Sequence, residues 1–269
     1  YRHYPGPKFG RQGIRELCGI EKGPILMSAL KPLGRSAKDF GETAYKLALG
    51  GCPLIKDDHS LFNQSYAPFK DRVKACVDSV NNANAKTGGR SLYIANCTAD
   101  SMEFLERAMT AQELGAGGIM AAPGLLGLSI IRELSSAPDF HLPIFLHPCF
   151  SGPLVLSADS GISPFCCYGQ FSRLAGADAA IFTSFGGRFP FTEEVCRKIC
   201  DGTETEMGGL RSIFPVPSGG MKWQLFKKMV QVYGPDAIFL VGGALLTESD
   251  DLTANMHFYY EKVNEAVNK

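Results

Sequence analysis

Short apolar runs alternate with longer amphipathic segments along almost the whole chain, and this alternation constrains the fold more than any other feature. The apolar runs predict eight strands, at 24–30, 53–55, 91–95, 118–122, 142–146, 179–183, 212–216 and 237–241. Between them, apolar residues recur at helical spacing, most clearly at 71–85, 101–114, 222–233 and 252–267. Strands that are apolar throughout are buried on both faces, which is typical of a parallel sheet.

Eight strand-and-helix units in 269 residues predict an α/β fold of the (β/α)8 TIM-barrel type, with a closed parallel sheet. An open, doubly wound sheet uses the same alternation. It would be favoured by a Gly-x-Gly-x-x-Gly turn after the first strand, and the sequence has none there. We expect residues 1–22 to form a segment leading into the barrel and residues 23–269 to form the barrel itself.

The charge balance excludes several classes of function. The chain has 27 basic and 27 acidic side chains, so a general nucleic-acid or anionic-membrane binder is not expected. No apolar run is long enough to span a bilayer and no signal peptide precedes the first strand, so we expect a cytoplasmic protein, or a stromal one if the source is eukaryotic. The nine cysteines include no Cys-x-x-Cys pair and indicate small buried thiols in a reducing compartment.

The second predicted strand ends in four consecutive ionisable residues, Lys56, Asp57, Asp58 and His59. Such a cluster at the end of a buried strand is costly unless its members are paired or bind metal. Because side chains alternate sides along a strand, Lys56 and Asp58 should face the same way, and His59 should turn in from the loop. A carbamate formed by CO2 on Lys56 would make this set a metal site. The alternative is a salt-bridged polar cluster at the barrel mouth.

Two other predicted strands end in residues able to move protons. Lys31 would act as a base if burial or a nearby cation lowers the pKa of its amine, and the alternative is an ordinary loop lysine. His147 would shuttle a proton or bind a phosphate, and the alternative is a hydrogen-bonded core histidine. Reactive residues at the ends of several strands are how a β/α barrel builds an active site.

Glycine pairs follow the seventh and eighth predicted strands. Backbone amides at such positions approach anions closely, and these two loops often hold phosphate in barrels of this type. The residues predicted to bind phosphate are Ser218, Gly219, Gly220, Gly242 and Gly243. The alternative is that these are simple turn glycines.

Two further candidates are single residues. Arg188 follows Gly186 and Gly187 in a loop able to place a cation over the site, and a solvated loop arginine is the alternative. Asn96 ends the third predicted strand, where its amide would orient a substrate oxygen.

Taken together, these motifs resemble a known family. The matching segments are Tyr4-Pro-Gly-Pro-Lys-Phe-Gly, Leu30-Lys-Pro, Gly50-Gly through Lys56-Asp-Asp-His, Glu113-Leu-Gly-Ala, Leu146-His-Pro, Arg173-Leu-Ala-Gly-Ala-Asp, Pro217-Ser-Gly-Gly and Val241-Gly-Gly. In this order, along nearly the whole chain, they resemble the barrel of the RuBisCO large subunit, and more closely that of the RuBisCO-like (form IV) proteins.

The resemblance implies roles for the strand-end residues. Lys56 would be the carbamylated metal ligand and Asp58 the second protein ligand of Mg2+. His59 stands where RuBisCO has a glutamate, and an imidazole admits a softer divalent metal. Lys31 matches the lysine that removes the proton, and His147 matches the active-site histidine after the fifth strand. Arg188 falls near the lysine of the mobile sixth loop.

Departures from the family pattern imply a different substrate from that of RuBisCO. Pro148 stands where an arginine grips the second phosphate, and Lys31-Pro-Leu-Gly lacks the second lysine of the usual motif. The resemblance therefore implies metal-dependent proton transfer on a keto-sugar monophosphate through an enediolate, as in isomerases and enolases of the methylthioribulose 1-phosphate type in methionine salvage, and not CO2 fixation.

Three alternatives stay open at this point. They are a decarboxylase of a related keto sugar acid, an inactive barrel with a binding or regulatory role, and a Schiff-base aldolase that uses Lys31 or Lys56. The resemblance also implies a homodimer with active sites between subunits, and an N-terminal α+β domain that this sequence does not contain.

Overall fold

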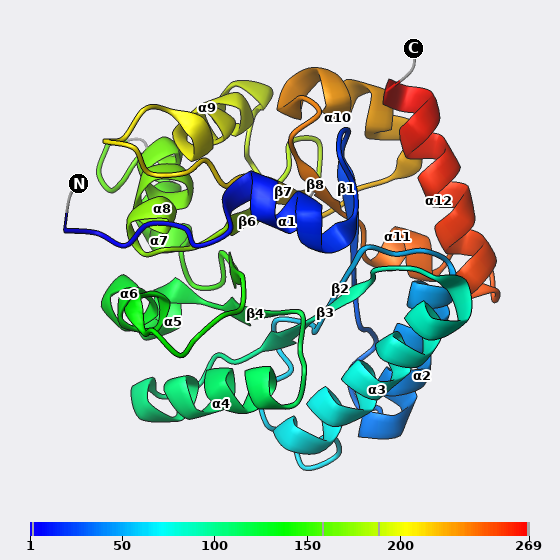
Figure 1. The fold of residues 1–269 in the computed structure, drawn as a ribbon. Helices are drawn as coiled ribbons and strands as arrows, with labels where there is room; N and C mark the ends of the chain where they lie inside the picture. The colour runs from blue at the N-terminus through cyan, green and yellow to red at the C-terminus, as the bar shows by residue number, and fades with distance from the viewer. Residues whose placement is uncertain (2, 158, 188, 268–269) are drawn as a thin grey trace.

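Within residues 1, 3–157, 159–187 and 189–267, which the computed structural model describes, eight strands form one parallel sheet (Figure 1). They are β1 (Ile25–Ala29), β2 (Leu54–Lys56), β3 (Leu92–Asn96), β4 (Gly118–Ala121), β5 (Ile144–Leu146), β6 (Ala179–Thr183), β7 (Phe214–Ser218) and β8 (Ile238–Leu240). Neighbours pair in the order β7-β6-β5-β4-β3-β2-β1-β8. This arrangement confirms the predicted (β/α)8 barrel.

Helices follow the strands and cover the outside of the sheet (Figure 1). They are α1 (Gly10–Cys18), α2 (Ala37–Leu49), α3 (Phe69–Thr87), α4 (Ser101–Glu113), α5 (Pro123–Leu126), α6 (Leu128–Ser136), α7 (Gly152–Val155), the π-helix η1 (Phe165–Gln170), α8 (Phe171–Leu174), α9 (Glu193–Glu204), the 3-10 helix η2 (Trp223–Leu225), α10 (Phe226–Tyr233), α11 (Gly243–Leu246) and α12 (Leu252–Val267). The helix predicted at 222–233 was placed too early, because Lys222 has an extended backbone and precedes η2.

The strand predicted at 212–216 is β7 and lies two residues further along the chain. The amide of Phe214 donates to the carbonyl of Asp178 on the β6 side. Because amides alternate sides along a strand, the nitrogens of Pro215 and Pro217 face β8, and neither carries a hydrogen. We find parallel pairing of β7 with β6, whereas β7 meets β8 by contact without a ladder in the described residues.

The inside of the barrel is filled by every second strand residue. In β1, Ile25 and Met27 belong to this inner cluster, whereas Leu26 belongs to the outer one. Ile14 and Cys18 of α1 pack against the inner cluster, so α1 closes the end at which the strands begin. In Figure 1 this helix crosses the barrel on the side facing the viewer, which leaves the opposite end for a site.

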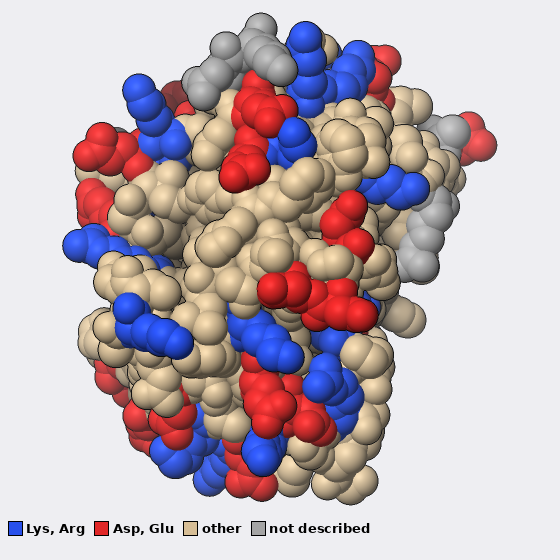
Figure 2. Space-filling model, turned by 90° about the vertical axis from the view of Figure 1, so that its right-hand side faces the viewer, with Lys and Arg blue, Asp and Glu red and all other residues tan. Residues whose placement is uncertain are grey.

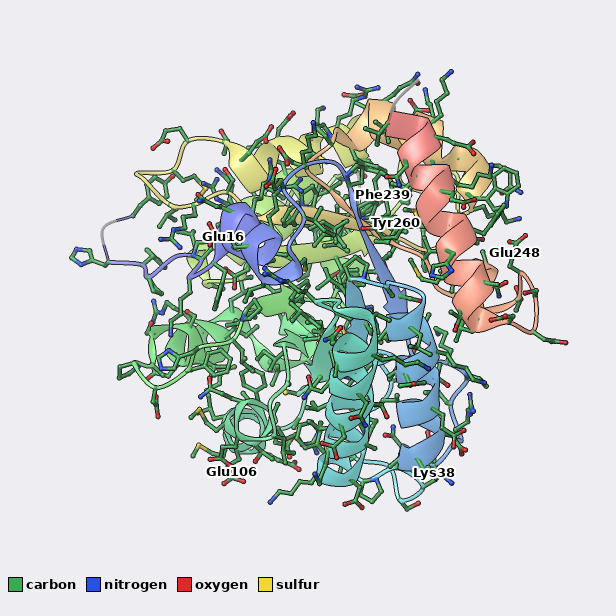
Figure 3. All side chains as sticks on the ribbon, turned by 45° about the vertical axis from the view of Figure 1, so that its right-hand side comes forward. Glu16, Lys38, Glu106, Phe239, Glu248 and Tyr260 are labelled. Carbon is green, nitrogen blue, oxygen red and sulfur yellow. The ribbon has the colours of Figure 1, made fainter. Side chains whose placement is uncertain are left out.

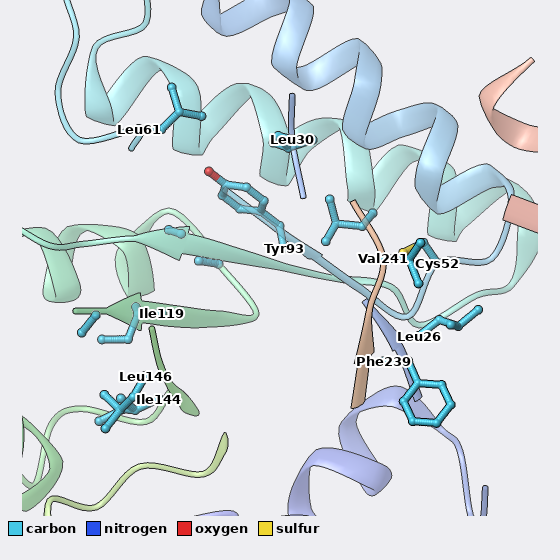
Figure 4. Packing of buried hydrophobic residues seen from close by; sticks show 14 of the residues in the cluster. Leu26, Leu30, Cys52, Leu61, Tyr93, Ile119, Ile144, Leu146, Phe239 and Val241 are labelled. Atoms are coloured by element: carbon cyan, nitrogen blue, oxygen red, sulfur yellow. The ribbon is translucent and has the colours of Figure 1, made fainter. Parts of the chain in front are cut away.

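The outer cluster lies between the sheet and the helices. Figure 4 shows Leu26 of β1, Phe239 of β8 and the adjacent Val241 within it. Figure 3 shows Phe239 among the strands, three charged residues near the edge of the molecule (Lys38, Glu106 and Glu248), and Glu16 on α1. Burial on both faces explains why the strands are apolar throughout.

Basic and acidic side chains are intermixed on the face shown in Figure 2, in keeping with 27 of each in the chain. All nine cysteines are free thiols, and five of them are buried. Among the described helices, none combines the length and the apolar character that crossing a membrane requires.

Candidate active site

The inward-facing side chains change from apolar to polar at the ends of the strands. Leu54 of β2 belongs to the inner cluster, and the next two inward positions are Lys56 and Asp58. Both are 2% exposed. They face the barrel interior together, as the strand alternation predicts, and Asp57 between them points outward toward α3.

These residues line a cavity of about 800 Å³. Its polar lining includes Lys31, Lys56, Asp58, His59, His147, Ser218, Gly219, Gly220, Lys222, Gly242 and Gly243. The structure thus brings together ten of the twelve residues singled out in the sequence. Arg188 lies outside the described residues, and Asn96 does not line the cavity.

Lys31, Asp58, His59 and His147 form a contiguous group. The ammonium of Lys31 lies 2.5 Å from Oδ2 of Asp58, so Asp58 is in an ion pair whose partner comes from outside the Lys56–His59 cluster. Nδ1 of His59 lies 3.5 Å from the other carboxylate oxygen. The imidazoles of His59 and His147 stack with their centroids 4.4 Å apart. Asp58 and His59 together therefore link residues that follow β1, β2 and β5.

The pKa values of the two buried residues, Lys56 and Asp58, are both lowered, but for different reasons. Burial lowers the pKa of Lys56 to about 8, although Asp58 and Asp57 oppose the shift. Burial alone would raise the pKa of Asp58, but the Lys31 ammonium and the Ser60 amide outweigh it and bring this pKa to about 2. About one tenth of Lys56 is consequently a neutral amine at pH 7, and Asp58 is a carboxylate.

His147 is held as a neutral imidazole. Burial, with Lys56 and His59 nearby, lowers its pKa well below the usual value. Nδ1 accepts a 3.1 Å hydrogen bond from the amide of Cys149. The ring proton of the neutral form therefore sits on Nε2, where it is able to donate to a substrate oxygen.

The residues at the end of β2 fit a divalent metal. Oδ2 of Asp58 is buried and makes no hydrogen bond of normal geometry, although the Lys31 ammonium is close. Asp58 and His59 alone are too few, since no group of three or more His, Cys, Asp or Glu suited to a metal exists within the described residues. A carbamate on Lys56 would supply the third ligand from the same inward-facing row.

Asp57 supports the site from the outer side of the sheet. The sequence predicted no separate role for it. Its carboxylate is fully buried and accepts from the hydroxyl of Tyr93 at 2.7 Å and from the amide of Asn96 at 2.9 Å. Nε of Arg72 on α3 lies 3.2 Å away, and Arg72 also donates to three carbonyls of the loop after β2: Leu61, Phe62 and Ala67. This network clamps the loop that carries His59.

Asn96 belongs to the same clamp. Its Nδ2 donates to the carbonyls of His59 and Leu61, and its Oδ1 accepts from the amide and hydroxyl of Thr98. Because both ends of the amide are occupied inside the protein, the prediction that Asn96 orients a substrate oxygen receives no support from the geometry.

The glycine loops form another part of the wall. Gly219 and Gly220 both have positive φ, and a Cβ at Gly242 or Gly243 would meet open space. Lys222, which we had placed in a helix, lines the cavity beside these loops. The cavity therefore combines exposed backbone with a cation, as a phosphate site requires.

The rest of the wall is largely apolar and comes from the loops after β5 and β6. It includes Phe150, Val155, Leu156, Tyr168, Phe189 and Phe191. None of these was singled out in the sequence, although Phe150 follows the His147-Pro148 motif closely enough to have been considered. The loop after β6 approaches the loop after β7 so closely at Gly187 that a Cβ there would come within 2.3 Å of the Gly219 carbonyl oxygen, so this position requires glycine.

A closed β/α barrel with its ionisable residues gathered at the carboxyl ends of the strands defines the class of barrel enzymes. Residues 10–255 match the family described as ribulose bisphosphate carboxylase large chain, catalytic domain. The chain belongs to this family, and within it to the RuBisCO-like proteins.

Similar proteins align with nearly the whole chain. A 5-methylthioribulose-1-phosphate isomerase of Rhodospirillum rubrum is 34% identical over 99% of this chain and 70% of its own length. A 2,3-diketo-5-methylthiopentyl-1-phosphate enolase of Geobacillus thermodenitrificans is 36% identical over 91% of this chain and 59% of its own length. A RuBisCO-like protein of Alicyclobacillus acidocaldarius superposes with a TM-score of 0.91 at 30% identity, over 100% of this chain and 70% of that one.

Proposed function

We propose that the protein catalyses proton transfer on a keto-sugar monophosphate as an isomerase or enolase of the methylthioribulose 1-phosphate type, and not carboxylation. One observation carries this proposal: Lys31, Asp58 and His147 meet at one cavity whose wall also contains two glycine loops. The relatives named as such an isomerase and such an enolase support the same chemistry.

Two residues would take part in the proton transfer. Lys31, once its ammonium has lost a proton, would take the proton from the carbon beside the substrate carbonyl, leaving an enediolate. Nε2–H of His147 would donate a hydrogen bond to a substrate oxygen and hold the reacting carbon in place. Return of the proton to the neighbouring carbon gives an isomer, and protonation elsewhere gives an enol.

The two ends of the substrate would bind different walls. Gly219, Gly220, Gly242 and Gly243 would bind the phosphate through their backbone, with Lys222 supplying charge. The cavity has no arginine after His147, where Pro148 stands, so a second phosphate lacks a counter-charge there. The apolar wall suits a substrate with one phosphate and an apolar opposite end.

Asp58, His59 and a carbamate on Lys56 would hold Mg2+ or another divalent metal. When bound, such an ion polarises the substrate carbonyl and stabilises the negative charge that develops on its oxygen. Lys56 suits carbamylation because CO2 reacts with the neutral amine, and its pKa is lowered to about 8.

Solvent exchange tests this function. In D2O with Mg2+ and bicarbonate, we expect the protein to introduce deuterium at the carbon beside the carbonyl of a methylthio keto-pentose phosphate, as followed by NMR. At constant dissolved CO2, activation should rise as pH increases through about 8, since the unprotonated fraction of Lys56 increases there. The same sugar phosphate without protein is the control. No exchange with both additives present would contradict the proposal.

We further propose that the barrel pairs with a second copy of the chain at the end that carries the site. Four large apolar residues there are 38–71% exposed and follow four successive strands: Leu33, Tyr66, Met102 and Leu125. Exposed apolar residues gathered at one end of a barrel indicate an interface. Sedimentation of the protein should show a dimer that Met102→Lys shifts toward monomer, whereas a monomer at every concentration would exclude this pairing.

A further inference from the structure

Phe150 differs from the other residues that line the cavity in both its backbone and its side chain. Its φ is +65°, and it is the single non-glycine residue with positive φ in the described part of the chain. Its aromatic side chain is 68% exposed. A bulky residue adopts this backbone region at a cost of about 1–3 kcal/mol, and such positions persist only where the surroundings enforce them.

Hydrogen bonds on one side enforce this conformation. The hydroxyl of Ser151, the next residue, donates to the carbonyl of Pro148 at 2.6 Å and lies 2.7 Å from the hydroxyl of Tyr168. Tyr168 is carried by the π-helix η1, a type of helical irregularity that is frequent at functional sites. Ser151, the residue after Phe150, is thereby hydrogen-bonded to a separate helix, η1.

Packing enforces it from the other side. Gly124 in α5 lies so close that a Cβ there would come within 2.5 Å of the Cys149 carbonyl oxygen and 3.0 Å of the Phe150 carbonyl carbon. The amide of Cys149 is bonded to His147. The loop is therefore held on both sides, and this fixes the position at which Phe150 lines the cavity.

The surroundings indicate what the ring covers. In the circular strand order, the loop after β5 lies opposite β1, which is followed by Lys31. The same cavity is also lined by apolar side chains, including Val155, Leu156 and Phe191. We propose that Phe150 is a specificity-determining residue whose ring covers the apolar group at the end of the substrate opposite its phosphate. This inference rests on the proposed function.

The test compares Phe150→Gly with the unaltered protein on two sugar phosphates. One carries a methylthio group at the end opposite the phosphate, and the other carries a hydroxyl there. We expect Phe150→Gly to raise KM for the methylthio substrate by about tenfold and to leave KM for the hydroxyl analogue unchanged. The unfolding midpoint should stay equal or rise, because glycine adopts this φ without strain.

Leu154→Ala is the matched control, since Leu154 is 44% exposed in the following helix and does not line the cavity. It should change neither KM. Equal changes in KM for both substrates of Phe150→Gly, or no change, would overturn the inference.

Failure of the proposed function gives a different result. If the unaltered protein turns over neither sugar phosphate, calorimetric binding of the same two compounds decides the role of Phe150. About tenfold tighter binding of the methylthio compound by the unaltered protein than by Phe150→Gly would support it. Equal binding by the two proteins, or no binding by either, would overturn it.

Discussion

Replacing Lys31 with methionine is expected to lower kcat and kcat/KM equally, by about 10²–10⁴. Lys31 lines the cavity, is 42% exposed in its side chain, and pairs with Asp58 at 2.5 Å. Methionine keeps most of the side-chain length but cannot accept a proton. Initial rates and solvent deuterium exchange should fall together, because both depend on the same proton abstraction.

Lys222→Met is the matched control for Lys31→Met. Lys222 lines the cavity beside the Gly219–Gly220 turn, so its loss should raise KM through weaker phosphate binding with a smaller effect on kcat. If Lys31→Met retained full exchange, or changed KM alone in the way expected of Lys222→Met, Lys31 would not be the base.

Replacing Arg72 with methionine is expected to destabilise the protein by about 3–5 kcal/mol, because it leaves the Asp57 carboxylate buried without its cation. Both side chains of this pair are 0% exposed, and Nε lies 3.2 Å from Oδ2. The loop carbonyls that Arg72 bonds would lose their donors as well. Urea unfolding measures the loss.

The double variant Arg72→Met with Asp57→Asn separates the buried charge from the other contacts. An asparagine keeps an acceptor for Tyr93 and carries no charge, so the double variant should be less destabilised than the sum of the single ones. Arg107→Met is the control, since Arg107 also lies over the Phe69 ring but pairs with Glu103, which is 47% exposed. Additive losses, or equal effects at Arg72 and Arg107, would refute a strong buried pair.

The strands and their order along the chain were predictable because each apolar run is a local feature of the sequence. All eight predicted strands overlap the observed ones, and the shared direction of Lys56 and Asp58 followed from the two-residue period. The predicted position of β7 was two residues too early, because its prolines make the strand pattern hard to recognise. Pro215 and Pro217 lack N–H donors only on the side that faces β8. Lys222 was misplaced because the backbone after the two glycines is extended.

The features that the sequence did not reveal depend on distant partners. The amide of Asn96 seemed available for substrate, and only the loop folded against it shows that His59 and Leu61 occupy it. Arg72 looked like one more charge on a helix, yet it is fully buried against Asp57. No local sequence pattern predicts such pairs, because the paired residues are separated by a loop whose composition does not constrain the pairing.

By itself, the sequence determined that this protein is a parallel barrel and which residues stand at the ends of its strands, since both follow from periodicity along the chain. Only the tertiary structure decided which of those residues share a cavity, which are consumed by internal hydrogen bonds, and that Phe150 is held in a left-handed conformation at the wall. The physical reason is that burial, charge pairing and backbone strain depend on neighbours that closure of the barrel brings together.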